Sequence, residues 1–191
     1  MNAEAAVDYV LSLAKEHRVP DADVMLARED KLTLRINQGR VEKVDQATAM
    51  GLGVRVVQEG RTGLSFTERL EPDALGKAFL AAKENAALLD PTPVLLPEPP
   101  GKVPDPEALQ LYNPKLDALT AEQLATFGLE AEAAARGADK RVTSVPYLVV
   151  SRDSSSYEVA SSHGVRYRQR SNSIGAYCQV LLQENGSRKS G

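Results

Sequence analysis

Residues 28–60 read REDKLTLRINQGRVEKVDQATAMGLGVRVVQEG, and residues 152–186 read RDSSSYEVASSHGVRYRQRSNSIGAYCQVLLQENG. Each stretch opens on arginine and an acidic residue, passes through an alternating segment and reaches a first glycine. Each then runs through further extended segments to a second glycine. These glycines are Gly39 and Gly60 in the first stretch, and Gly164 and Gly186 in the second. Self-similarity at a fixed spacing indicates an internal duplication, so we expect two structurally related halves.

Working outward from Gly39, the first stretch predicts an antiparallel meander. Leu32, Leu34 and Ile36 alternate with polar residues, which is typical of a half-buried strand. Asn37 to Gly39 supplies residue types that tolerate a positive φ in a hairpin turn. In the first half the predicted strands are 24–28, 31–37, 40–47, 49–58 and 61–67. In the second half they are 142–151, 155–161, 165–170 and 173–183.

Helical patterns precede or follow these strands. Residues 3–18 carry apolar side chains at helical spacing, with Asn2 as a candidate N-cap and Pro20 as a stop. Residues 72–89 form a second predicted helix that starts at Pro72. A capping box at Thr120 opens a third predicted helix, which runs to about Gly137. We therefore predict an α+β fold: an antiparallel sheet or sheets with helices packed on one side, built from two related helix-plus-meander halves, the second truncated.

The stretch 91–106, PTPVLLPEPPGKVPDP, holds seven prolines and reads as a semi-rigid extended connector. We therefore predict a first α+β unit at 1–90, a proline-rich connector at 91–110 and a second, incomplete α+β unit at 111–191.

Composition excludes several classes of protein. The net charge of −3 gives no overall attraction to nucleic acid or to anionic lipid. No apolar run approaches the length of a transmembrane helix, and the N-terminus has no signal-peptide pattern. Cys178 is the one cysteine, so no internal disulfide can form. We expect a cytoplasmic protein without membrane contact, and nucleic acid is not an expected partner.

The sequence shows no combination of residues that is typical of a catalytic or metal-binding site. The two histidines, His17 and His163, lack the companion ligands of a zinc site, and Cys178 has no activating neighbour and is expected to be buried. Gly51-Leu-Gly53 is interpreted as a central strand or a bulge rather than a phosphate loop, and Ser154 to Ser156 as a turn or linker. We assign no catalytic, cofactor-binding or metal-binding residue.

Arg166, Arg168 and Arg170 alternate along a predicted strand, which places all three on one face. One interpretation is a cationic stripe that contacts a peptide carboxylate, an acidic partner or a phosphate. The other is a charged, solvent-facing surface that protects a strand edge from aggregation.

Several segments together resemble the N-terminal region of the TldD/PmbA family, whose members are also labelled modulators of DNA gyrase. The resemblance is carried by Leu34-Arg-Ile-Asn-Gln-Gly-Arg-Val-Glu42, Gly51-Leu-Gly-Val-Arg-Val56, Gly60-Arg-Thr-Gly63, Leu111-Tyr-Asn-Pro114 and Glu130-Ala-Glu-Ala-Ala-Ala135. Ser162-His-Gly164, and Ser171-Asn-Ser173 leading to Cys178, look more like the PmbA (TldE) branch than the TldD branch.

The resemblance implies a zinc metallopeptidase (hydrolase) system that acts on unfolded or extended peptides. In that family, TldD-type subunits carry a His-Glu-x-x-x-His helix, whereas PmbA-type subunits lack it and pair with TldD-type subunits. No family ligand maps onto a position of this chain, so the resemblance places zinc only in a TldD-type partner or in the family's C-terminal domain. The implied partners are a TldD-type paralogue in a heterodimer, or a second copy, together with an unfolded peptide.

We therefore expect a non-catalytic scaffold and substrate-binding part of a peptidase subunit. Two alternatives stay open at this point: a stand-alone peptide- or protein-binding module, and a regulator associated with DNA gyrase.

Overall fold

The computed structural model describes residues 1–92, 94–101, 105 and 107–191. The predicted connector 91–110 therefore lies partly outside the described residues, because positions 93, 102–104 and 106 are not among them. In chain order the elements are α1 (Ala3–Glu16), β1 (Asp21–Asn37), β2 (Arg40–Gln58), β3 (Arg61–Thr67), α2 (Pro72–Leu88), α3 (Pro114–Asp117), α4 (Ala121–Gly137), β4 (Val142–Ser161), β5 (Arg166–Glu184) and β6 (Ser187–Ser190).

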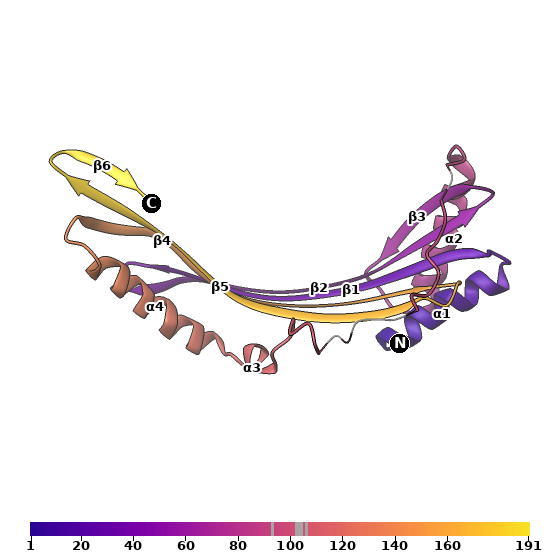
Figure 1. Cartoon of the computed structure of the whole chain (residues 1–191), viewed down its shortest axis with the longest axis horizontal. Helices are drawn as coiled ribbons and strands as arrows, with labels where there is room; N and C mark the ends of the chain where they lie inside the picture. The colour runs from indigo at the N-terminus through magenta and orange to yellow at the C-terminus, as the bar shows by residue number, and fades with distance from the viewer. Residues whose placement is uncertain (93, 102–104, 106) are drawn as a thin grey trace. The chain divides into compact units, whose positions relative to one another are not determined.

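The described strands form one sheet in the order β3-β2-β1-β4-β5-β6 (Figure 1). Each half of the chain contributes a helix followed by three strands, α1-β1-β2-β3 and then α4-β4-β5-β6. Both halves place their strands in chain order outward from the β1–β4 pair. The predicted α+β fold with two related helix-plus-meander halves is confirmed.

The corresponding turns of the two halves each contain a glycine with a positive φ. The first glycine of each half, Gly39 and Gly164, has φ of 72° and 84°, and the second, Gly60 and Gly186, has φ of 72° and 79°. This left-handed region favours glycine, which explains why glycine recurs at corresponding places in both halves.

The strands are longer than the sequence pattern predicts. We expected breaks near residues 29–30 and 48, but β1 and β2 run without interruption for 17 and 19 residues. In the same way β4 is continuous through Ser154 to Ser156, so the prediction of a turn or linker there is wrong. Polar residues interrupt the apolar alternation at these places, whereas the backbone hydrogen bonds of a sheet require no apolar side chain.

Local capping signals predict the helix starts well. The Asn2 side chain accepts a hydrogen bond from the Ala5 backbone N–H at 2.8 Å, and the capping box between Thr120 and Gln123 is present. The start of α2 has no side-chain cap, since the N-cap residue is Glu71 and Pro72 begins the helix. No helix among the described residues combines the length and apolar character needed to cross a membrane.

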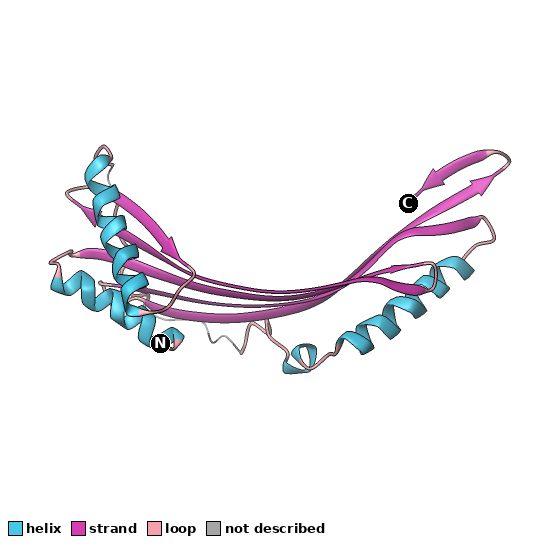
Figure 2. Cartoon of the chain, turned by 180° about the vertical axis from the view of Figure 1, so that it is seen from behind, coloured by secondary structure: helices cyan, strands magenta, loops and turns pink. Residues whose placement is uncertain are grey.

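The chain divides into two compact units, which are interleaved along the sequence. Unit 1 comprises residues 1–28, 49–109 and 156–170. Its core joins α1 and α2 to one face of the strands (Figure 2), with Val24, Val54 and Phe79 at or near zero exposure. A Cβ on Gly63 of β3 would lie 1.9 Å from the carbonyl oxygen of Ala82 in α2, so this helix can approach the strand only at a glycine.

Unit 2 comprises residues 29–48, 110–155 and 171–191. Here α4 packs on the strands through Leu124, against Leu34, Ile36 and Leu148. The predicted sequential boundaries, 1–90 and 111–191, describe the repeat rather than these interleaved units, and as domain boundaries they stay a prediction.

Candidate functional site

The three arginines of the predicted stripe lie at the start of β5, and the first is held by two carboxylates. The Arg166 Nε donates to Glu158 Oε1 at 2.8 Å, and one of its terminal nitrogens donates to Asp8 Oδ1 at 2.6 Å. These contacts connect β5 to β4 and to α1. Hydrogen bonding to Asp8, together with the charges of both carboxylates, raises the pKa of Arg166.

Arg168 is held even more tightly. Its Nε lies 2.9 Å from Glu158 Oε2, and one terminal nitrogen donates to Glu158 Oε1 at 3.1 Å and lies 2.9 Å from Glu4 Oε1. Hydrogen bonds to Glu158 and Glu4 raise the pKa of Arg168. Glu158 is only 7% exposed, so a single buried carboxylate fixes the positions of two guanidinium groups.

A groove of about 480 Å³ opens beside this ion-pair cluster in unit 1. Leu26, Met50 and Leu70 supply apolar lining, and Arg28, Arg168 and Arg170 supply cationic lining. The structure therefore brings Arg168 and Arg170 to a common groove, whereas Arg166 does not line it. An apolar hollow with a few convergent charged groups is the usual form of a binding site for an organic ligand.

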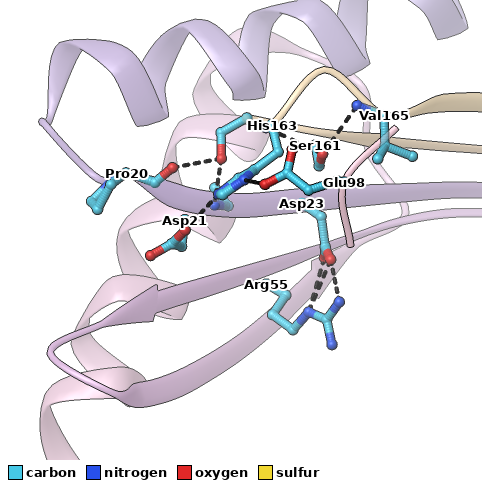
Figure 3. Close-up of polar contacts among 10 residues, drawn as sticks. Pro20, Asp21, Asp23, Arg55, Glu98, Ser161, His163 and Val165 are labelled. Atoms are coloured by element: carbon cyan, nitrogen blue, oxygen red, sulfur yellow. Dashed lines mark hydrogen bonds and ion pairs between the residues drawn. The ribbon is translucent and has the colours of Figure 1, made fainter. Parts of the chain in front are cut away.

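A second polar cluster lies at the β4–β5 turn of unit 1 (Figure 3). The His163 Nε2 lies 2.6 Å from Asp21 Oδ1, and its Nδ1 lies 3.1 Å from Glu98 Oε1. Hydrogen bonds to Asp21 and then to Glu98 raise the pKa of His163. His163 thus links the start of β1 to the described part of the connector.

Ser161, two residues before His163, is not arranged for nucleophilic catalysis. The Ser161 hydroxyl oxygen accepts backbone N–H groups of His163 and Val165, at 3.2 and 3.3 Å. Both ring nitrogens of His163 face carboxylates instead (Figure 3), so the ring is not placed to take a proton from Ser161. The neighbouring Asp23–Arg55 ion pair completes this polar surface.

Unit 2 contains a buried carboxylate that the sequence pattern does not reveal. Glu132 of α4 is 1% exposed, accepts the Gly39 backbone N–H at 2.7 Å and pairs with Arg136 at 2.9 Å. Burial by itself would raise the pKa of Glu132, but the hydrogen bonds from Gly39 and Arg136 outweigh it, so the pKa lies below its ordinary value. Glu132 fastens the β1–β2 turn to α4.

Cys178 is exposed on β5, so the prediction of a buried cysteine is wrong. Helix α4 packs on β1 and β4 and leaves the part of β5 that carries Cys178 accessible. Partial desolvation of the sulfur and the charge of Glu132 raise the pKa of the thiol, which disfavours the reactive thiolate. Within the described residues, no three or more His, Cys, Asp or Glu side chains gather as a metal site would require.

Comparisons with known proteins place the two halves of the chain in consecutive domains of one family. Residues 22–86 match the PmbA/TldA metallopeptidase domain 1, and residues 114–191 match the PmbA/TldA metallopeptidase central domain. The chain is also 27% identical over 188 residues to the Metalloprotease PmbA of Escherichia coli O157:H7, which covers 96% of this chain and 40% of that protein. The chain thus spans less than half the length of this relative.

Solved structures share the fold. A protein from Thermotoga maritima MSB8 named "putative modulator of a DNA gyrase" aligns with a TM-score of 0.86 at 17% identity, covering 100% of this chain and 42% of the other. TldE from Thermococcus kodakarensis aligns with a TM-score of 0.82 at 18% identity, covering 96% of this chain and 40% of the other. At these identities the likeness shows the fold alone.

Proposed function

This chain belongs to the TldD/PmbA family, and on that premise we propose that it is the N-terminal scaffold and substrate-binding part of a PmbA/TldE-type peptidase subunit. In this role it contributes to the proteolysis of unfolded or extended peptides, together with a TldD-type metallopeptidase partner in the cytoplasm. The observation that carries the proposal is the match, in order, to domain 1 and then the central domain of the PmbA/TldA metallopeptidases.

The assignment to the PmbA/TldE type rests on local sequence. Ser162-His-Gly164 and the strand that carries Cys178 resemble that branch more than the TldD branch. The 27% identity to a protein named Metalloprotease PmbA supports the same branch.

A non-catalytic role for these residues agrees with their chemistry. In the family, the metal ligands lie on a His-Glu-x-x-x-His helix, and neither His17 nor His163 belongs to such a motif. Both ring nitrogens of His163 face carboxylates, so this histidine is not placed as a zinc ligand, and the zinc of this peptidase system belongs to the TldD-type partner or to the family's C-terminal domain.

The described surface offers two ways to hold an extended peptide. The edge strands β3 and β6 can pair with a further strand through backbone hydrogen bonds, which is largely independent of peptide sequence. The groove beside Arg168 and Arg170 adds apolar and cationic contacts. Both suit a substrate without stable structure of its own.

Co-purification tests the partner assignment. The complete subunit, co-expressed with its TldD-type paralogue, should elute as a stoichiometric complex, and metal analysis of the separated subunits should find zinc in the paralogue. A subunit that elutes only by itself or as a homo-oligomer, or that retains zinc without the paralogue, would contradict the proposal.

A further inference from the structure

The groove in unit 1 combines an apolar lining with a guanidinium group whose position is fixed. Glu158 engages the Nε and one terminal nitrogen of Arg168, and Glu4 engages that same terminal nitrogen. The other terminal nitrogen of Arg168 has no hydrogen-bond or ion-pair partner among the described residues. Arg168 therefore keeps two N–H donors while its side chain is already ordered, which lowers the entropy lost when it binds a ligand.

The charges at the groove favour an anion. Three guanidinium groups line it, from Arg28, Arg168 and Arg170, beside the two carboxylates of Glu4 and Glu158. Arg28 and Arg170 have interactions of their own, so the donors available to an anion are those on the remaining terminal nitrogen of Arg168. Hydrogen bonds from a guanidinium group to a carboxylate are charge-assisted and strong, so the remaining N–H donors of Arg168 suit a carboxylate ligand.

The apolar lining restricts the ligand further. Leu26, Met50 and Leu70 lie in the same groove of about 480 Å³, and a fully hydrated anion such as inorganic phosphate gains nothing from them. A ligand that uses both features carries an apolar group next to its carboxylate. The last residue of a peptide chain has this combination when its side chain is apolar.

We infer that this groove binds the C-terminal end of an extended peptide, with the terminal carboxylate at Arg168 and an apolar last side chain against Leu26, Met50 and Leu70. The inference rests on the proposed function, because that function makes a peptide the expected ligand. In this inference the groove binds the free end of a peptide chain. An edge strand by itself binds the end and the middle of a peptide alike.

Fluorescence anisotropy with the intact chain tests this inference. The probes are an N-terminally labelled unstructured peptide that ends in leucine with a free carboxylate, and the same peptide as its C-terminal amide. Because a hydrogen bond to a charged group is lost, the amide should bind about tenfold more weakly. Equal affinity of the two peptides would overturn the inference.

Arg166 provides a matched control. Arg166→Gln removes a hydrogen bond to the same Glu158 but alters a side chain outside the groove, so it should keep the preference for the carboxylate. Arg168→Gln should abolish that preference. If both variants lose it equally, the groove is not the site.

Ala3→Trp offers a test that leaves the ion pairs in place. Ala3 is exposed and lines the groove, so the larger side chain should block it and weaken carboxylate binding about tenfold or more. Unchanged binding would count against the groove. Octanoate, like the end of such a peptide, has a carboxylate next to an apolar group. If octanoate binds as tightly as the peptide, the groove is a fatty-acid site and the inference is overturned.

The outcomes separate this inference from the proposed function. If the complete subunit assembles with the TldD-type paralogue and supports cleavage equally for acid and amide peptides, the inference fails and the proposed function stands. If the chain binds carboxylate ends but no complex forms, the proposed function fails and the groove assignment stands.

Discussion

Replacing Glu158 by glutamine should destabilise unit 1 far more than replacing its surface neighbour Glu4. Glu158 is 7% exposed and accepts charged hydrogen bonds from Arg166 at 2.8 Å and from Arg168 at 3.1 Å, with a further Arg168 contact at 2.9 Å. In Glu158→Gln the carboxylate charge is lost and an amide N–H₂ group faces guanidinium donors. Losing one partner of a buried ion pair costs about 3–5 kcal/mol.

The lower end of that range applies here. After the substitution Arg166 still has Asp8 and Arg168 still has Glu4 as acidic partners, and both guanidinium groups can reach water. We therefore expect a loss of about 3 kcal/mol in the free energy of unfolding at pH 7. Urea titration followed by circular dichroism measures this value.

Glu4→Gln is the control for this experiment. It removes an exposed carboxylate from the same Arg168, and exposed ion pairs contribute about 1 kcal/mol or less. The reasoning is refuted if Glu158→Gln destabilises the protein no more than Glu4→Gln does.

Three further outcomes follow from the contacts. Gly63→Ala should destabilise the protein by about 2–3 kcal/mol in a urea titration, because the added Cβ meets the α2 backbone, whereas Gly76→Ala in α2 has open space and should stabilise it by about 1 kcal/mol. The pKa of His163 is raised above 6.5. The protonated histidine therefore stabilises the protein fully below pH 6.5, and this contribution is lost as the pH rises through the folded-state pKa. Melting temperatures of the protein and of His163→Gln should differ below pH 6.5 and converge above the folded-state pKa. Glu132→Ala should cost about 3 kcal/mol at neutral pH by urea titration; because the pKa of Glu132 is lowered from 4.5, that difference should hold above pH 4.5 and shrink as the pH falls through the folded-state pKa.

Local features of the fold were predictable because they depend on nearby residues. The repeated glycines fixed the turns at Gly39 and Gly164, and the residue types at Asn2 and Thr120 fixed helix starts. Strand continuity was not predictable, because β4 runs through Ser154 to Ser156 between β5 and β1, and β1 is distant in sequence.

The candidate site was predictable only in part. Alternation placed Arg168 and Arg170 on one face, and both do line the groove. The partners that decide their role come from elsewhere in the chain: Glu4 precedes Arg168 by more than 160 residues and lies on α1. No local pattern marks Glu158 as buried or links Glu98 to His163, since those contacts depend on the tertiary register.

Cleavage of an unfolded peptide by the reconstituted pair tests the central claim most directly. The complete subunit, its TldD-type paralogue and their mixture are each incubated with the peptide, and the products are followed by mass spectrometry. The account predicts zinc-dependent cleavage by the mixture, and none by the complete subunit alone. Cleavage by the subunit alone, or an equal rate for the paralogue with and without it, would contradict the account.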